Sequence, residues 1–224
     1  ARNYFVVAIA AVTAVLALSL VPSVWSGNGS ATIFNVNWIP GLQAGVYIDS
    51  LSVLFACLVA FFALIIAVYS IGYMKGEEGL TRYYYLILLF IGSMIGLVIS
   101  DNMIQLFIFW EMVGLCSYAL ISFWYKKPES IKAGVKVFIM TRIGDISLLA
   151  AIGLLYMMFT TFSFHGVIGG IQDAAAAGTL NTSLLVVVAF LVLGGAIAKS
   201  AQLPLFTWLY SAMEAPTSVS ALLH

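Results

Sequence analysis

Residues 103–125 read MIQLFIFWEMVGLCSYALISFWY, an apolar run with a single charge, Glu111. A helix that crosses a membrane needs roughly 20 consecutive, mostly apolar residues, so this run is long enough to span. The whole chain has the same character, because 63% of its 224 residues are hydrophobic and 8% are charged. In soluble domains roughly 45–50% of residues are hydrophobic and roughly 25% are charged, and disordered chains are less hydrophobic still. The sequence therefore predicts an integral membrane protein, and its net charge of zero gives no field that would attract nucleic acid.

Five further apolar stretches accompany this one. The sequence predicts an all-α, polytopic transmembrane helix bundle, a single domain over residues 1–224 with six spans: 4–21, 46–71, 83–99, 103–125, 135–162 and 184–210. None of them alternates in the way of a membrane β-strand. Only residues 100–102 separate the third and fourth spans, so these two helices must be antiparallel neighbours. Residues 163–183 contain four consecutive alanines, from which we expect a short surface helix.

Lysines and arginines alternate strictly among the connections between the spans. Basic residues in short loops mark the cytoplasmic side of a membrane. Connections 22–45, 100–102 and 163–183 contain none, whereas the alternate connections hold Arg2, Lys75, Arg82, Lys126, Lys127 and Lys132. We therefore expect the basic loops on the cytoplasmic side of a prokaryotic cell membrane, or on the matrix or stromal side of an organellar inner or thylakoid membrane.

The first span has a second interpretation, as a cleaved signal peptide. Arg2 precedes its apolar run, and Pro22, Ser23 and Ser26 follow it, which resembles a cleavage zone. Signal peptides carry only about 7–15 apolar residues, and the run at 4–21 is longer. The length favours a true span.

Residues that could hold a redox centre are scarce. The two cysteines, Cys57 and Cys116, form no C-x-x-C pair, and the two histidines are His165 and His224. Iron–sulfur clusters need about four thiolates, and no glycine-rich phosphate loop follows a strand. We therefore expect no metal, haem, iron–sulfur or nucleotide cofactor in this chain.

Two charges stand deep in the predicted spans, where an ionisable residue costs roughly 2.5–3.5 kcal/mol and usually marks a functional site. Glu111 is one of them, and the alternative to a functional role is a neutral glutamic acid that is hydrogen-bonded to another helix. Lys199 is the other, and it lies between the glycine pair 194–195 and Pro204, where helices kink or break. This spacing predicts one discontinuous helix around Lys199, although snorkelling to the interface is the competing interpretation.

Arg142 and Asp145 form a second group of intramembrane charges. Their spacing of three residues places them on one helix face, where they can pair and reduce the cost of each other's burial. A packing clamp and a role in ion transfer are both consistent with this pair.

Four strings carry a resemblance to a known family: FIFWEMVGLCSYALISFW (107–124), KVFIMTRIGDISLL (136–149), GGAIAKSAQLPLFTWLYSAMEAPTSVSALLH (194–224) and GYMKGEEGLTRYYYL (72–86). They resemble the antiporter-like subunits of respiratory complex I, most closely the chain 5 or L subunit, and the large subunit of multisubunit sodium/proton antiporters. The resemblance implies a coupled Glu111 and Lys199 pair, a charged pair at Arg142 and Asp145, and a further polar group at His224.

The function implied by the resemblance is a proton-translocating membrane subunit of a complex I-like quinone oxidoreductase. NAD, FMN, iron–sulfur clusters and quinone would then belong to other subunits, with which this chain would assemble in the lipid bilayer. A cation/proton antiporter subunit without redox chemistry is the alternative, and a purely structural subunit is the third. The resemblance also implies a fragment: one family helix would precede residue 1, and the second inverted repeat would follow residue 224.

Overall fold

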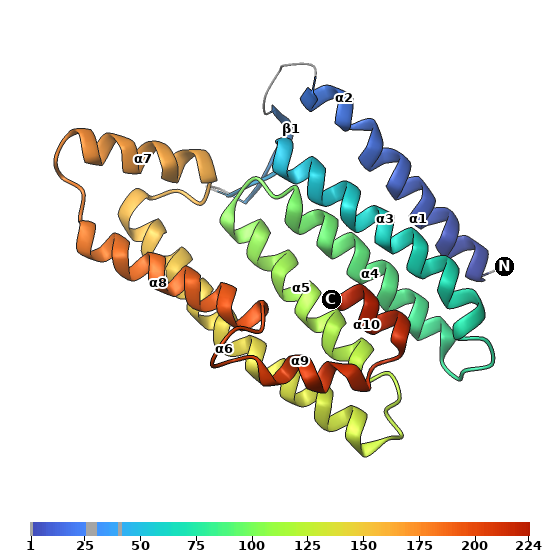
Figure 1. The fold of residues 1–224 in the computed structure, drawn as a ribbon. Coiled ribbons are helices and arrows are strands. Elements are labelled where there is room, and N and C mark those ends of the chain that lie inside the picture. The colour runs from blue at the N-terminus through green and yellow to red at the C-terminus, as the bar shows by residue number, and fades with distance from the viewer. Residues whose placement is uncertain (1, 26–30, 40–41) are drawn as a thin grey trace.

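The computed structural model describes residues 2–25, 31–39 and 42–224. Across this described part, six helices are long and apolar enough to cross a membrane, which confirms the predicted fold class. They follow one another across the molecule in chain order (Figure 1), and each packs against the next. They are α1 (Arg2–Ser19), α3 (Ser50–Tyr73), α4 (Leu80–Val98), α5 (Met103–Ile121), α6 (Pro128–Phe159) and α8 (Thr182–Lys199).

Shorter elements complete the chain. The predicted surface helix is present as α7 (Phe164–Ala176). Helix α1 is long and apolar enough to span, and its Val6 and Ala10 lie in the core of the bundle. The short elements are α2 (Val21–Ser23), α7 (Phe164–Ala176), α9 (Thr207–Ser211), a 3-10 turn (Ala212–Glu214) and α10 (Thr217–Leu223).

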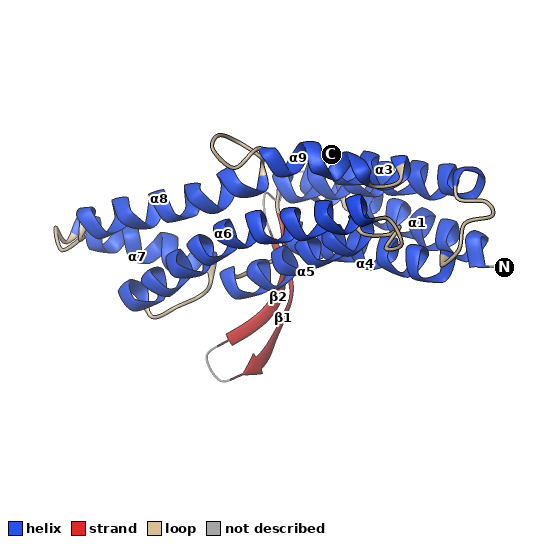
Figure 2. Cartoon of the chain, turned by 90° about the horizontal axis from the view of Figure 1, so that it is seen from below, coloured by secondary structure: helices blue, strands red, loops and turns tan. Residues whose placement is uncertain are grey.

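A β-hairpin that was not predicted from the sequence precedes the second long helix. Strands β1 (Ala31–Ile39) and β2 (Leu42–Ile48) pair antiparallel and project away from the helices (Figure 2). The Tyr47 amide donates to the Ile99 carbonyl at 3.0 Å, and Gln105 bonds the Gly45 backbone. The predicted span 46–71 therefore began too early, because its first residues belong to β2.

Two side-chain caps fix where helices begin. Asp49 accepts a hydrogen bond from the Ser52 amide at 2.7 Å, and the Ser52 hydroxyl bonds back to the Asp49 amide, so the helix α3 starts with a capping box. Asn102 accepts from the Gln105 amide at 2.8 Å and starts α5. The reversal between α4 and α5 takes only residues 99–102, as expected from the short connection.

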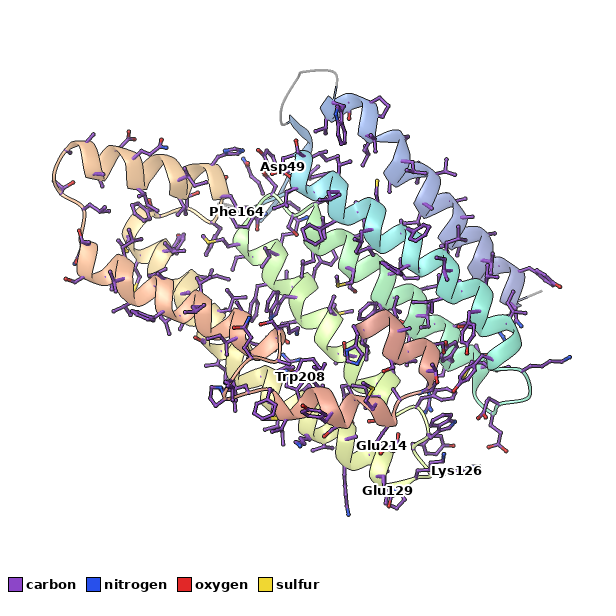
Figure 3. The ribbon with its side chains drawn as sticks, in the orientation of Figure 1. Asp49, Lys126, Glu129, Phe164, Trp208 and Glu214 are labelled. Carbon is purple, nitrogen blue, oxygen red and sulfur yellow. The ribbon has the colours of Figure 1, made fainter. Side chains whose placement is uncertain are left out.

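The basic loops gather at one end of the bundle. Arg2 donates to Thr81 at 2.7 Å, and Lys126 pairs with Glu78 at 2.7 Å. Figure 3 shows Asp49 at the end opposite to Lys126. The structure thus separates the two sets of connections as the charge pattern predicted, and the cytoplasmic placement of the basic set stays a prediction.

The predicted span 184–210 is wrong at its end, because α8 stops at Lys199 and the next helix, α9, starts at Thr207. The expected interruption around Lys199 is confirmed. Helix α10 then returns to pack on α3 and α5. It is held by Tyr83, a fully buried side chain whose hydroxyl contacts Ser70 at 2.8 Å and Ser218 at 2.7 Å.

Candidate functional site

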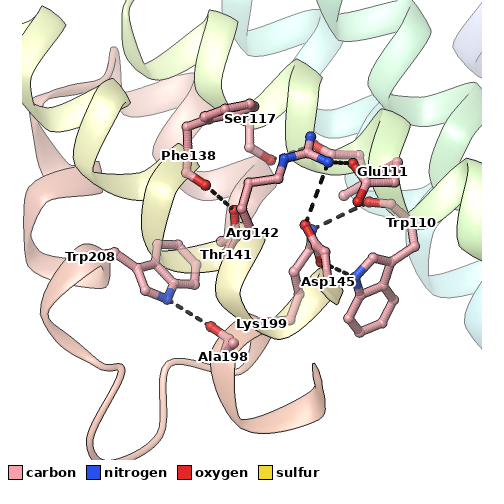
Figure 4. Close-up of polar contacts among 11 residues, drawn as sticks. Trp110, Glu111, Ser117, Phe138, Thr141, Arg142, Asp145, Ala198, Lys199 and Trp208 are labelled. Carbon is pink, nitrogen blue, oxygen red and sulfur yellow. Dashed lines mark hydrogen bonds and ion pairs between the residues drawn. The ribbon is translucent and has the colours of Figure 1, made fainter. Parts of the chain in front are cut away.

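Four charged side chains from three helices meet in one group, here called the charged cluster (Figure 4). Helix α5 supplies Glu111, α6 supplies Arg142 and Asp145, and α8 supplies Lys199. Glu111 forms an ion pair with Arg142. Arg142 Nη1 lies 3.9 Å from Asp145 Oδ2, and Lys199 Nζ lies 3.9 Å from Asp145 Oδ1. Acid and base therefore alternate along a connected path from α5 to α8.

The cluster lies mostly inside the protein. The side chain of Asp145 is 3% exposed, that of Lys199 19%, that of Glu111 22% and that of Arg142 29%. Two acids balance two bases, so the four charges can be buried together without net charge. Removing one member leaves its partner uncompensated in a medium of low dielectric constant, which is strongly destabilising.

The direct partner of Glu111 is Arg142. The resemblance implied a coupled Glu111 and Lys199, but among the residues that the structure describes no ion pair joins those two side chains. The pairing of Arg142 with Asp145, expected from their spacing, is present at 3.9 Å. Arg142 and Asp145 thus stand between Glu111 and Lys199 and supply the polar groups that connect them.

Trp110 and Gly114 belong to the site and were missed by the sequence analysis. Trp110 Nε1 donates to Asp145 Oδ1 at 2.5 Å, and the Trp110 carbonyl accepts from Lys199 Nζ at 3.3 Å. A Cβ at Gly114 would lie 2.9 Å from Lys199 Nζ. These contacts join different helices, so the only signal in the sequence is the position of both residues within a turn of Glu111.

Glycines allow α6 and α8 to approach closely beside the cluster. A Cβ at Gly144 would collide with the Cβ of Ala198 and lie 3.2 Å from the Gly195 carbonyl. Ser147 Oγ donates to the Leu191 carbonyl at 2.7 Å and ties the same two helices together. Small residues and interhelical hydrogen bonds are the usual basis of helix packing in membranes. This contact brings Asp145 within reach of Lys199.

The break after Lys199 is satisfied by the protein. Trp208 Nε1 on α9 donates to the Ala198 carbonyl at 2.9 Å (Figure 4), and the Gln202 amide donates to the Ile197 carbonyl at 3.0 Å. Carbonyls freed at a helix end inside a membrane must find such donors. Lys199 is therefore held at an ordered helix end.

His224 lies apart from these contacts. It caps the end of α10, with its amide bonded to the Ser220 carbonyl at 3.1 Å, and its side chain is exposed in this structure. Within the described ranges, the structure does not bring the His224 imidazole into hydrogen-bond or ion-pair contact with the charged cluster. Its role in translocation stays a prediction.

Metal ligands do not gather in the part of the chain that the structure describes: no group of three or more His, Cys, Asp or Glu side chains could hold an ion there. Cys57 and Cys116 are both free thiols. The arrangement at the charged cluster suits the movement of protons or the pairing of charges, since it consists of carboxylates, a guanidinium and an amine.

Comparisons with known proteins bear on the same residues. A family model described as NADH:quinone oxidoreductase/Mrp antiporter, TM matches residues 100–224, and one described as NADH-Ubiquinone oxidoreductase (complex I), chain 5 N-terminus matches residues 38–84. The first match contains all the members of the charged cluster.

Curated relatives agree with the family models. NAD(P)H-quinone oxidoreductase chain 5 of Synechocystis sp. is 43% identical over 183 residues, covering 82% of this chain and 27% of the relative. Na(+)/H(+) antiporter subunit A1 of Staphylococcus haemolyticus is 40% identical, and the match covers 99% of this chain and 27% of the relative. NADH-quinone oxidoreductase subunit L of Mycobacterium tuberculosis is 44% identical, and the match covers 84% of this chain and 29% of the relative. The chain thus spans less than a third of the length of these relatives.

Solved structures show the same fold. The structure of the Mrp complex from Dietzia sp. superposes with a TM-score of 0.86 at 30% identity, covering all of this chain and 24% of the matched chain. The membrane-bound sulfane sulfur reductase, an archaeal respiratory membrane complex, superposes with a TM-score of 0.84 at 24% identity and shares the fold, with 97% of this chain and 43% of the matched chain covered.

Proposed function

Because this chain belongs to the NADH:quinone oxidoreductase/Mrp antiporter family of membrane subunits, we propose that it carries protons across the membrane through the charged cluster. The observation that supports this most is the alternation of acid and base from Glu111 to Lys199 along three consecutive ion pairs. Such a series of ionisable groups inside a membrane is the usual form of a proton relay.

The proposed mechanism is a competition for Arg142. Arginine keeps its proton, so the groups that exchange protons are Glu111, Asp145 and Lys199. When Glu111 is ionised it holds Arg142, and Asp145 is left to stabilise the Lys199 ammonium. When Glu111 takes up a proton, Arg142 turns to Asp145 and weakens the attraction that retains the proton on Lys199. Protonation at one end of the cluster thereby releases a proton at the other.

We further propose that the chain works in a complex I-like quinone oxidoreductase, with electron transfer and its cofactors in other subunits. The second candidate is a cation/proton antiporter without redox chemistry, which the likeness to the antiporter subunit A1 and to the Mrp structure supports. Partners in either case are other membrane subunits. A purified complex in vesicles separates the two: quinone reduction drives proton uptake in the first, whereas a sodium or potassium gradient drives it without any electron donor in the second.

The test of the proton route is Glu111→Gln in the assembled complex, reconstituted in vesicles with a pH-sensitive dye. Loss of the titrating carboxyl is expected to lower proton transport at least tenfold, a typical contribution of a positioned proton-transfer group. Glu129→Gln is the matched control, because Glu129 is exposed in the first turn of α6. Normal transport by an assembled Glu111→Gln complex would contradict the proposal.

A further inference from the structure

Trp110 contacts both partners of one ion pair in the charged cluster. We propose that Trp110 is a positioning residue that holds Asp145 and Lys199 apart, so that the lysine stays weakly paired and can exchange its proton. The inference rests on the proposed function, since it gives Trp110 a task in proton release.

The geometry at Asp145 Oδ1 shows the competition. This oxygen accepts a hydrogen bond from Trp110 Nε1 at 2.5 Å, whereas Lys199 Nζ lies 3.9 Å away. Charge-assisted hydrogen bonds between an ammonium and a carboxylate are about 2.7–2.9 Å long. The attraction between Asp145 and Lys199 therefore acts without a hydrogen bond, while the indole N–H occupies the oxygen that faces the ammonium.

The lysine is held from the same residue. Lys199 Nζ donates to the Trp110 carbonyl at 3.3 Å and lies 5.1 Å from the centre of the indole ring. It also abuts Gly114, one turn further along α5, where an added Cβ would lie 2.9 Å from Nζ. The main chain of α5 thus fixes the ammonium while the side chain of Trp110 fixes the carboxylate.

Asp145 has the capacity to move closer to Lys199 if the indole releases it. Its Oδ2 is buried and accepts no hydrogen bond from the described residues, and Arg142 Nε is likewise buried without an acceptor. The groups that face the carboxylate are Arg142 from its own helix, Lys199 from α8 and Trp110 from α5; Glu111 reaches it only through Arg142. Arg142 attracts the carboxylate through Oδ2, whereas the indole N–H is bonded to Oδ1, the oxygen nearest to Lys199. Removing the N–H therefore frees that oxygen to approach the ammonium.

The expected effect follows from the distance. If the distance between Asp145 Oδ1 and Lys199 Nζ closes from 3.9 Å to about 2.8 Å, the equilibrium constant for forming the ion pair rises roughly tenfold at an effective dielectric constant of about 20. Lys199 then gives up its proton less readily. The alkaline limb of the pH profile of proton transport should move up by about 1 pH unit, and transport near neutral pH should fall about tenfold.

The experiment is Trp110→Phe in the assembled complex, measured as proton transport in vesicles from about pH 5 to pH 10. This change keeps a ring and the backbone carbonyl and removes the N–H donor. Trp124→Phe is the matched control, since Trp124 Nε1 also donates to a carboxylate, Glu77 Oε2 at 3.0 Å, at an exposed site. The control should leave both the rate and the pH profile unchanged.

A second variant separates shape from hydrogen bonding. Replacing Trp110 by 3-benzothienylalanine preserves the bicyclic ring and substitutes sulfur for the N–H, so it serves where phenylalanine disturbs assembly. An upward shift of the alkaline limb in either variant supports the proposal. A uniform loss of rate with no shift, or no change at all, overturns it and leaves Trp110 with a packing role. Glu111→Gln, measured in parallel, reports on proton transport itself: normal transport there contradicts the proposed function, whatever Trp110 does.

Discussion

Gly144 is the position at which the packing of the bundle can be tested most directly against its function. In Gly144→Ala, the added Cβ would collide with the Ala198 Cβ and lie 3.2 Å from the Gly195 carbonyl and 3.4 Å from the Gly194 carbonyl. Two of these neighbours are backbone atoms and none is the end of a flexible side chain. The substitution therefore forces α6 and α8 apart.

The magnitude follows from two opposing effects. Overpacking of this kind costs about 1–3 kcal/mol, whereas exchanging glycine for alanine inside a helix contributes about 1 kcal/mol of stability. Gly153→Ala on the same helix isolates the second effect, because nothing lies within 4 Å of its added Cβ. The difference between the two variants is expected to be about 1–3 kcal/mol in the free energy of unfolding, with Gly144→Ala the less stable.

The assay is reversible unfolding in mixed micelles by titration with sodium dodecyl sulfate, followed by proton transport in vesicles. If α8 moves outward by about 1 Å, the attraction between Asp145 and Lys199 weakens about fourfold at an effective dielectric constant of about 20. Transport by Gly144→Ala should therefore differ from that of Gly153→Ala. Equal stability of the two variants would refute the close contact between α6 and α8.

Three further outcomes are expected. Asp145→Asn, which removes the carboxylate shared by two ion pairs, should lower proton transport at least tenfold, and Asp145→Glu should restore part of it. Burial raises the pKa of Asp49, but hydrogen bonds from Ser52 outweigh it and hold that pKa below the usual value. The ionised cap should therefore stabilise the protein above about pH 4, and this stabilisation should be lost as the pH falls. Unfolding curves of Asp49→Asn should lack this acid dependence. A cysteine placed at Lys126, in a variant without the native cysteines, should react with an impermeant maleimide only from the cytoplasmic side, and one at Asp173 only from the opposite side.

The fold was predictable where one physical rule dominates. Hydropathy and length set the six spans, because the hydrocarbon core requires a nearly fixed number of apolar residues. The same rule misled at the start of the 46–71 prediction and at the end of the 184–210 prediction: residues 46–48 pair as part of β2, and α8 stops at Lys199, before Pro204 and α9. Hydropathy does not distinguish apolar residues in a spanning helix from apolar residues that pack beside one.

The four charges of the cluster and the pairing of Arg142 with Asp145 on one helix were predictable, whereas the pairs between helices were not. Burial cost identifies Glu111, Arg142, Asp145 and Lys199, since few charges occur so deep in a membrane. Which acid meets which base depends on how α5, α6 and α8 are rotated against one another, and the pattern along one helix carries no such information. The contribution of Trp110 was missed for the same reason, since its N–H donor reaches a carboxylate on another helix.

The interruption of the helix after Lys199 has an electrostatic consequence of its own. Lys199 stands in the last turn of α8, where the aligned peptide dipoles amount to roughly half a negative charge and favour a cation by about 0.3–2 kcal/mol. A helix that continued past Lys199 would place no helix C-terminus beside the lysine. Unlike the carboxylates of the cluster, a peptide dipole does not titrate, so the lysine keeps a permanent partial counter-charge in every protonation state of its neighbours.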